Sequence, residues 1–296
     1  MTLTDSHVVA VLGAGTMGHG IAQLTAAAGF PTRLYDVSAD AAAAGLAKVR
    51  GSVDRLVEKK KLPVEARDAL LERLSASADL RAAVSGATIV IEAAPEKMEL
   101  KVDLFRRVKD VVAESTLFAS NTSSLSITEL GQSLGAPERT VGMHFFNPPP
   151  VMELLEIVRG VGTSDKTLDR ALDFAKRVGK TAIVVRDFPG FATSRLGVCI
   201  GAEAIRMLEQ GVAGVVEIDR AMELGYRHPM GPLKLGDLVG LDVRLAILEH
   251  LHRELGEVFR PPALLRQMVR AGRLGKKSGI GFYRWTDSGP EPADPR

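Results

Sequence analysis

The sequence predicts an α/β protein, with a doubly wound parallel sheet followed by an all-α domain, and three observations support this prediction. Short apolar runs rich in valine and isoleucine alternate with stretches whose apolar residues recur at helical spacing. A glycine triplet follows the first apolar run directly, where a strand turns into a helix. Beyond the turn at residues 187–190 the periodicity is helical alone, so we expect a sheet domain over residues 1–187 and a helical domain over residues 188–296.

The glycine triplet has the spacing of a phosphate-binding loop. It comprises Gly13, Gly15 and Gly18 and follows a strand expected over residues 7–12. The first glycine permits a tight turn, the second lets the backbone approach a pyrophosphate, and the third lets the helix lie close on the sheet. Thr16 and Met17 open that helix, whose unpaired N–H groups hold phosphates. This is the arrangement of a Rossmann-type dinucleotide site.

An acidic residue after the second expected strand favours NAD over NADP. That strand spans residues 32–35, and Asp36 follows it, 18 positions after the last glycine. An acid at this place binds the ribose 2′-hydroxyl of NAD, and its charge repels the 2′-phosphate of NADP. Val37 and Ser38 offer no arginine to receive that phosphate. We therefore expect NAD as the cofactor.

Composition places the chain among ordinary globular proteins. Its 296 residues suffice for two domains, with 46% apolar and 25% charged residues. A net charge of +2 gives no support to a nucleic-acid partner or a membrane surface, and no apolar run is long enough to span a bilayer. Cys199 is the only cysteine, which excludes an internal disulfide and fits a reducing compartment. The first strand begins too soon after Met1 for a signal peptide, so we expect a cytoplasmic protein.

A helical insertion follows the second strand. The alanine-rich residues 38–74 predict two helices broken at residues 61–63. Its tip carries Lys59, Lys60 and Lys61, which fit either a solvated helix end or a phosphate-binding function. Further strands are expected near residues 74–77, 88–92, 116–119, 140–143, 151–158 and 181–185, further helices near 98–112, 168–175, 196–208, 216–224, 235–251 and 264–270, and a disordered tail from residue 286.

Polar residues gather where the expected strands end. Asp36 follows the second strand, Glu96 the fourth and residues 121–124 the fifth, and His144 follows the sixth. In doubly wound sheets ligands bind beyond the carboxyl ends of the strands. The active site is therefore expected at this edge of the sheet.

His144 is a candidate base for hydride transfer from an alcohol, which requires a group that takes the hydroxyl proton. Of six histidines it alone lies at a strand's carboxyl end in the expected cofactor crevice; the alternative is a hydrogen-bonded core histidine. Glu156 lies twelve residues on, across a proline turn, and can return beside the ring to fix its tautomer and stabilise its protonated form. We see no metal-ligand spacing, hydrolase elbow or Walker loop.

Several motifs together resemble those of the 3-hydroxyacyl-CoA dehydrogenases, including the bacterial 3-hydroxybutyryl-CoA enzymes. The run His144-Phe145-Phe146-Asn147-Pro148 with its downstream glutamate is the specific element, whereas the glycine loop is not. The resemblance extends over almost the whole chain, up to Tyr283. Its other segments are residues 91–96, 120–125, 189–191 and 275–279.

The resemblance implies a role for each matching position. It implies that His144 is the base, Glu156 its orienting partner, and Ser123 a hydrogen-bond partner of the substrate's C3 oxygen. It implies a coenzyme A contact for the lysines at the tip of the insertion, Lys59 and Lys60 included, and a homodimer formed through the helical domain. The positions that contact NAD in the family are Asp36, Glu96, Lys101, Asn147 and Lys277.

One position departs from the family pattern. Where the family has an asparagine that helps to fix the acyl thioester, this chain has Ser194, which lacks the amide's paired donor and acceptor. The main hypothesis is NAD-dependent interconversion of a 3-hydroxyacyl-CoA and the 3-ketoacyl-CoA, with no metal. Two alternatives stay open: the same chemistry on an acyl carrier protein in a biosynthetic pathway, and an NAD-binding protein that has lost catalysis.

Overall fold

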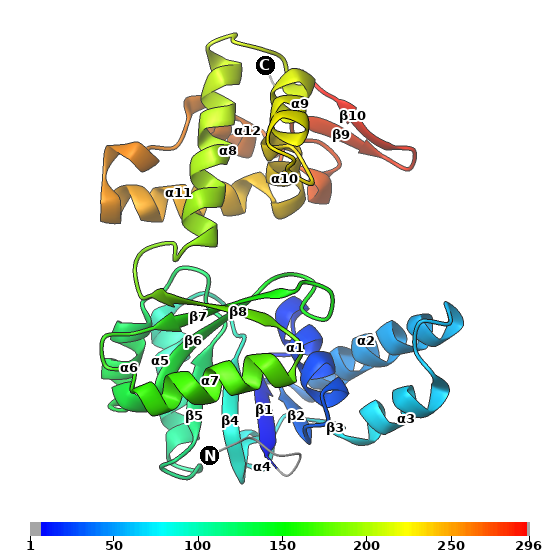
Figure 1. Cartoon of the computed structure of the whole chain (residues 1–296), viewed down its shortest axis with the longest axis vertical. Helices are drawn as coiled ribbons and strands as arrows, with labels where there is room; N and C mark the ends of the chain where they lie inside the picture. The colour runs from blue at the N-terminus through cyan, green and yellow to red at the C-terminus, as the bar shows by residue number, and fades with distance from the viewer. Residues whose placement is uncertain (1–6, 295–296) are drawn as a thin grey trace. The chain divides into compact units, whose positions relative to one another are not determined.

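The computed structural model describes residues 7–294 and divides the chain into two compact units, residues 1–188 and 189–296. The first unit is built on an eight-stranded sheet with strand order β3-β2-β1-β4-β5-β6-β7-β8 (Figure 1). Its strands are β1 Val8–Leu12, β2 Thr32–Tyr35, β3 Leu74–Ser77, β4 Ala87–Glu92, β5 Leu117–Ser120, β6 Thr140–Phe145, β7 Leu154–Arg159 and β8 Thr181–Arg186. Its helices are α1 Thr16–Ala27, α2 Ala39–Glu58, α3 Val64–Glu72, α4 Leu80–Val84, α5 Met98–Lys109, α6 Ile127–Leu134 and α7 Asp165–Arg177.

Helices cover both faces of this sheet, which explains the continuous apolar runs of its strands. In β1 the residues Val9, Ala10, Val11 and Leu12 are all fully buried. Val9 and Val11 join a core formed with α1, α2, α3 and α7, whereas Ala10 and Leu12 join a core formed with α4, α5 and α6. The doubly wound fold predicted from the sequence is confirmed.

The chain reverses its winding direction at β1, because β2 and β4 lie on its two sides, both parallel to it. A crevice opens at such a point beyond the carboxyl ends of the strands. The glycine loop follows β1 there. The fold therefore places the loop at the edge where a dinucleotide binds.

The sheet is not parallel throughout, which corrects the prediction. Strand β7 runs antiparallel to β6, and β8 is again parallel to β7. Only residues 146–153 separate β6 from β7, and a parallel crossover needs a dozen or more residues. The strand expected from residue 151 begins at Leu154, after the turn that contains Pro148 to Pro150.

The second unit is helical, as predicted, and it also contains a small two-stranded sheet. Its helices are α8 Thr193–Glu209, α9 Val215–Gly225, α10 Pro232–Val239, α11 Leu241–Leu255 and α12 Ala263–Arg270. The helix expected over residues 235–251 is two helices, because Gly240 has a φ of 105° between them. The tail expected to be disordered includes β10 Gly289–Pro292, which pairs with β9 Tyr283–Thr286.

Two buried aspartates attach this hairpin to the helices. Asp237 accepts hydrogen bonds from the N–H groups of Phe282 and Tyr283 and from the Trp285 indole, at 2.9–3.1 Å. The Tyr283 hydroxyl donates to Asp219 at 2.7 Å. Burial raises the pKa of both carboxyls, although these hydrogen bonds act in the opposite direction.

None of the described helices is both long enough and apolar enough to cross a membrane.

The raised pKa of Asp237 predicts that the free energy of unfolding falls as pH rises. Between 3.8, the ordinary carboxyl pKa, and the raised folded value, the native state binds more protons than the unfolded state, so stability decreases through this window. Asp237→Asn should flatten this dependence in urea titrations between pH 4 and 7. Asp169→Asn, at an exposed position of α7, is the control. Equal slopes for both variants would contradict the assignment.

Candidate active site

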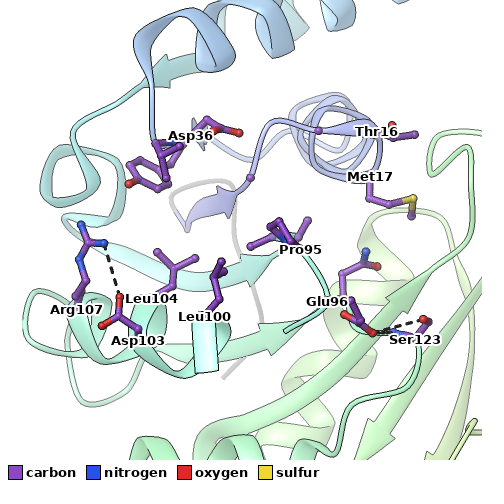
Figure 2. A pocket seen from close by; sticks show the side chains of 17 residues that line it. Thr16, Met17, Asp36, Pro95, Glu96, Leu100, Asp103, Leu104, Arg107 and Ser123 are labelled. Carbon is purple, nitrogen blue, oxygen red and sulfur yellow. Dashed lines mark hydrogen bonds and ion pairs between the residues drawn. The ribbon is translucent and has the colours of Figure 1, made fainter. Parts of the chain in front are cut away.

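A cavity of about 780 Å³ lies beyond the carboxyl ends of the central strands. Figure 2 shows Thr16, Met17, Glu96 and Ser123 at one end and Asp36, Asp103 and Arg107 at the other. A cavity of this size accommodates an extended cofactor. Its lining residues are Gly13, Gly15, Thr16, Met17, Tyr35, Asp36, Val37, Ala93, Ala94, Pro95, Glu96, Leu100, Asp103, Leu104, Arg107, Asn121 and Ser123.

The glycine loop has the geometry that a pyrophosphate requires. Gly13 has a φ of 102°, and a Cβ atom on Gly18 would lie 1.6 Å from the Gly13 carbonyl oxygen, so both positions need glycine. A Cβ atom on Gly15 would meet no protein atom within 4 Å, which leaves its backbone open toward the cavity. No side chain caps α1, so its first N–H groups remain available to an anion.

Asp36 joins the glycine loop to the end of β2. Its carboxylate accepts a hydrogen bond from the Ala14 N–H at 2.7 Å and another from the Val37 N–H at 2.8 Å. These two bonds fix the carboxylate at the cavity wall. Each oxygen retains acceptor capacity for a ribose hydroxyl.

The wall opposite the loop comes from α5, a contribution that was not predicted from the sequence. Leu100, Leu104 and Arg107 line the cavity together with Asp103, which lies 4.0 Å from the Arg107 guanidinium (Figure 2). Their i, i+3, i+4, i+7 spacing is one face of a helix, so the signal was present. The more apolar stripe of α5, including Phe105 and Val108, fills the core and dominates the pattern of this segment, so it hides the face that lines the cavity.

A buried ion pair stands at the end of β4. The Lys101 ammonium lies 2.7 Å from a carboxylate oxygen of Glu92, and both side chains are almost completely buried. Glu92 also accepts hydrogen bonds from the Ser120 hydroxyl and the Ala94 N–H. Burial raises the pKa of Glu92, and Lys101 opposes this effect.

Lys101 also orients Glu96, at 3.2 Å from its second oxygen. The first oxygen of Glu96 accepts hydrogen bonds from the Thr122 hydroxyl and the Ser123 N–H. Burial would raise the pKa of Glu96, but Lys101 and these donors outweigh it, so the pKa is lowered and the group stays ionised. Glu96 and Ser123 line the cavity, whereas Lys101 lies behind its wall and supports them.

His144 and Glu156 are direct neighbours across the β6–β7 pair. Nδ1 of His144 lies 2.7 Å from a carboxylate oxygen of Glu156, whose side chain has no exposed surface. With its proton on Nδ1, the ring presents Nε2 as the nitrogen that accepts a proton. The next residue, Phe145, donates its N–H to Asn121, a cavity-lining residue, at 2.9 Å. His144 therefore lies close to the edge where the cavity ends.

The other residues singled out from the sequence do not line the cavity. Asn147 is exposed in the loop after β6, and Lys59 and Lys60 are exposed at the tip between α2 and α3. Ser194 and Lys277 belong to the second unit, where Ser194 is half-buried in the first turn of α8. Lys277 forms an ion pair with Asp242 at 2.6 Å. Within residues 7–294, no group of three His, Cys, Asp or Glu side chains is placed to hold a metal ion.

Comparison with known proteins shows similarity along the chain. The family model for the NAD binding domain of 3-hydroxyacyl-CoA dehydrogenase matches residues 8–188, and the model for its C-terminal domain matches residues 190–285. The probable 3-hydroxybutyryl-CoA dehydrogenase of Bacillus subtilis is 46% identical over 94% of this chain and 97% of the relative. For the mitochondrial hydroxyacyl-coenzyme A dehydrogenase of Rattus norvegicus the identity is 41%, over 94% of this chain and 90% of the relative.

A solved structure of a 3-hydroxybutyryl-CoA dehydrogenase is also similar to this chain. The crystal structure of the (S)-3-hydroxybutyryl-CoA dehydrogenase of Ralstonia eutropha has a TM-score of 0.92 and 42% identity to this chain. The match covers 95% of this chain and all of that one.

Lys101→Met tests the buried ion pair. The substitution leaves the Glu92 carboxylate buried without its cation, so we expect a loss of about 3–5 kcal/mol in the free energy of unfolding, measured by urea denaturation. Adding Glu92→Gln should recover a large part of the loss. Lys97→Met, at an exposed position of the same segment, is the control and should change little. A Lys101→Met protein as stable as the control would refute the role.

Proposed function

The chain belongs to the 3-hydroxyacyl-CoA dehydrogenase family, and we propose that His144 is the base in its NAD-dependent oxidation of 3-hydroxyacyl-CoA to 3-ketoacyl-CoA. The observation that carries this assignment is the 2.7 Å contact between His144 Nδ1 and the fully buried Glu156 carboxylate. The simplest substrate is 3-hydroxybutyryl-CoA, and the reverse reduction uses the same groups.

The roles of the protein groups follow from the chemistry of alcohol oxidation. The hydroxyl proton must leave as hydride departs from C3, and bound NAD supplies the hydride acceptor. Nε2 of His144 takes the proton, and the resulting imidazolium is stabilised by Glu156, which stays negatively charged beside it. Ser123 donates to the C3 oxygen. Its hydroxyl lies 3.5 Å from Glu96, a contact weak enough to be exchanged for a substrate oxygen.

We assign the parts of NAD to different walls of the cavity. The N-terminus of α1 and the loop at Gly15 hold the pyrophosphate, and Asp36 accepts from the ribose. Glu96 contacts the cofactor at the end near Ser123, held in place by Lys101. The family resemblance implies two further cofactor contacts, Asn147 and Lys277, neither of which lines the cavity, and both stay predictions.

Coenzyme A contacts the tip of the helical insertion in this proposal. Lys59, Lys60 and Lys61 form an exposed group of three cations, and α2 ends just before them. Exposed cations attract the coenzyme's phosphates. No observation favours an acyl carrier protein over coenzyme A, so the carrier-protein alternative receives no support, nor does the non-catalytic one.

The second unit carries exposed apolar residues that favour a homodimer. Leu196 on α8 is 64% exposed, and Leu235, Leu238 and Val239 expose part of the face of α10. Side chains of this kind gathered on one unit are typical of a protein–protein contact. We propose a homodimer formed through this unit, in the cytoplasm, where the single Cys199 fits a reducing environment.

Leu196→Glu tests the dimer. A charge placed in an apolar contact should shift the protein from dimer to monomer, measured by sedimentation velocity at micromolar concentration. Val161→Glu, at an 89% exposed position of the first unit, should leave the mass unchanged. A wild-type protein that sediments as a monomer would defeat the proposal.

His144→Gln and Glu156→Gln test the base and its partner. Removing the base should lower kcat by about 10²–10⁴-fold with little change in the NADH dissociation constant, because neither residue lines the cofactor cavity. Glu156→Gln keeps the shape of the side chain but not its charge. We therefore expect kcat to fall less than in His144→Gln and the dependence of kcat on pH to change. The assay follows NADH absorbance with acetoacetyl-CoA. Wild-type turnover in His144→Gln would disprove the assignment.

A further inference from the structure

Asn121, the first residue after β5, has a side-chain amide of which only one end is bound by the protein. Its carbonyl oxygen accepts a hydrogen bond from the Phe145 N–H at 2.9 Å. Its amide nitrogen, Nδ2, makes no hydrogen bond with any of residues 7–294. The residue is half-buried and lines the cavity, and Nδ2 itself is not shielded from solvent. Asn121 therefore offers two N–H donors to an occupant of the cavity.

The orientation of this amide is fixed because the Phe145 N–H needs an acceptor. Strand β5 pairs with β6 only as far as Ser120 and Gly142, and Phe145 lies beyond that pair with its side chain 2% exposed. The Asn121 carbonyl oxygen continues the hydrogen bonding where the ladder ends. A flipped amide would turn an NH₂ group toward the Phe145 N–H and leave a donor unsatisfied, which costs free energy.

The main chain around Asn121 is held as well. Its own N–H donates to the Glu92 carbonyl oxygen at 2.8 Å, at the end of β4. The next residue, Thr122, is buried, and its hydroxyl donates to Glu96 and accepts from the Leu125 N–H. The free nitrogen of Asn121 is thus positioned before a ligand binds, and a donor positioned in advance loses little freedom on binding.

The neighbours of Asn121 identify the end of the cavity at which it stands. Ser123, two residues on, lies at one end of the cavity and Asp36 at the other (Figure 2). Phe145, which donates to Asn121, is the residue next to His144. In the proposed function His144 and Ser123 contact the reacting alcohol, whereas Asp36 contacts the adenosine half of the cofactor. Asn121 therefore stands at the end assigned to the nicotinamide.

The nicotinamide riboside half of NAD offers acceptors that match this donor. It carries two ribose hydroxyls and a carboxamide carbonyl oxygen. The Glu96 carboxylate at this end is ionised and only accepts hydrogen bonds, whereas Nδ2 of Asn121 only donates them. A wall with both kinds of group satisfies a ligand half that both donates and accepts.

We propose that Asn121 is a cofactor-binding residue, whose Nδ2 donates a hydrogen bond to an acceptor oxygen of the nicotinamide riboside half of NAD. The inference rests on the proposed function, which assigns the nicotinamide to this end of the cavity. Because the same side chain accepts from the Phe145 N–H, Asn121 also joins the bound cofactor to the strand that carries His144.

Two other roles for Asn121 explain less. A purely structural role uses the carbonyl oxygen alone and leaves two N–H donors at the cavity wall without an acceptor. A contact with the C3 oxygen of the substrate would duplicate the roles of His144 and Ser123 in the proposed function.

Asn121→Asp separates the two ends of the amide. The carboxylate still accepts from the Phe145 N–H, but it has no donor for the cofactor. In calorimetric titrations of the full-length protein, we expect the Kd of NADH to rise about 10-fold, as for the loss of one hydrogen bond. ADP, which lacks the nicotinamide riboside, should bind as tightly as it binds the wild type. Since ADP carries the same two phosphates, it reports any repulsion that the new charge alone causes.

ADP-ribose distinguishes the two sources of the acceptor oxygen. It keeps the second ribose and lacks the nicotinamide. Weaker binding of ADP-ribose to Asn121→Asp would support a ribose hydroxyl as the acceptor. Unchanged binding of ADP-ribose, with weaker binding of NADH, would support the carboxamide oxygen.

Two further variants control for charge and folding. Gln132→Glu makes the same change from amide to carboxylate at an exposed position of α6 and should leave all three Kd values unchanged. Asn121→Ala removes both ends of the amide, so it should weaken NADH binding and also lower the urea midpoint, because the Phe145 N–H loses its acceptor. Asn121→Asp should keep the wild-type midpoint.

The outcomes separate this inference from the proposed function. An unchanged Kd of NADH in Asn121→Asp would overturn the inference and leave the dehydrogenase function intact. An equal rise for NADH and ADP would assign the effect to charge and would also overturn it. So would a higher KM for acetoacetyl-CoA at an unchanged Kd of NADH, which would assign the amide to the substrate. A wild-type protein that does not bind NADH would defeat the proposed function, and the inference with it.

Discussion

The buried contact between Glu156 and His144 is the constraint on which the polar end of the β6–β7 pair depends. Glu156 stands on β7, between β6 and β8, and has no exposed surface, so protein groups must satisfy its charge. The antiparallel register puts His144 directly opposite. A shift of one residue would turn the two side chains to opposite faces of the sheet. The pairing of β6 with β7 therefore also orients the imidazole.

A second buried carboxylate, Glu92 at the end of β4, must likewise be satisfied by protein groups. Glu92 cannot be solvated, and Lys101 reaches it from α5. The same ammonium contacts Glu96, which in turn fixes the loop that carries Ser123. The polar wall of the cavity is thus connected to the core through one cation. A change at Lys101 therefore affects the loop of Ser123, which Lys101 does not itself contact, through Glu96.

The strand, loop and helix at the start of the chain could be predicted from the sequence because local rules determine them. A glycine spacing specifies the turn, and an apolar run specifies a strand buried on both faces. The direction of β7 could not be predicted in the same way, because an apolar run has the same pattern in a parallel and in an antiparallel strand. The direction is determined by the connection through Pro148, which is too short for a parallel crossover.

Other features depended on long-range contacts that no local pattern reveals. The hairpin at residues 283–292 contains Gly289 and two prolines, which suggest a loop, yet Asp237 holds it from 46 residues away. The resemblance placed Lys101 at the cofactor, whereas burial puts it behind the cavity wall. The half-buried position of Arg244 could not be predicted either, because in the sequence an arginine at a core-facing helical position looks like any surface arginine.

The two units differ in how completely their polar groups are satisfied. At the cavity of the first unit, Glu92 and Glu96 each have a cation and hydroxyl donors among the described residues. Such groups are held in place before any ligand arrives, which suits a reaction common to all substrates. In the second unit, the half-buried Arg244 has no hydrogen-bond or ion-pair partner among residues 7–294. A guanidinium held among apolar side chains in this way costs free energy, whereas the polar groups at the cavity are satisfied before a ligand binds.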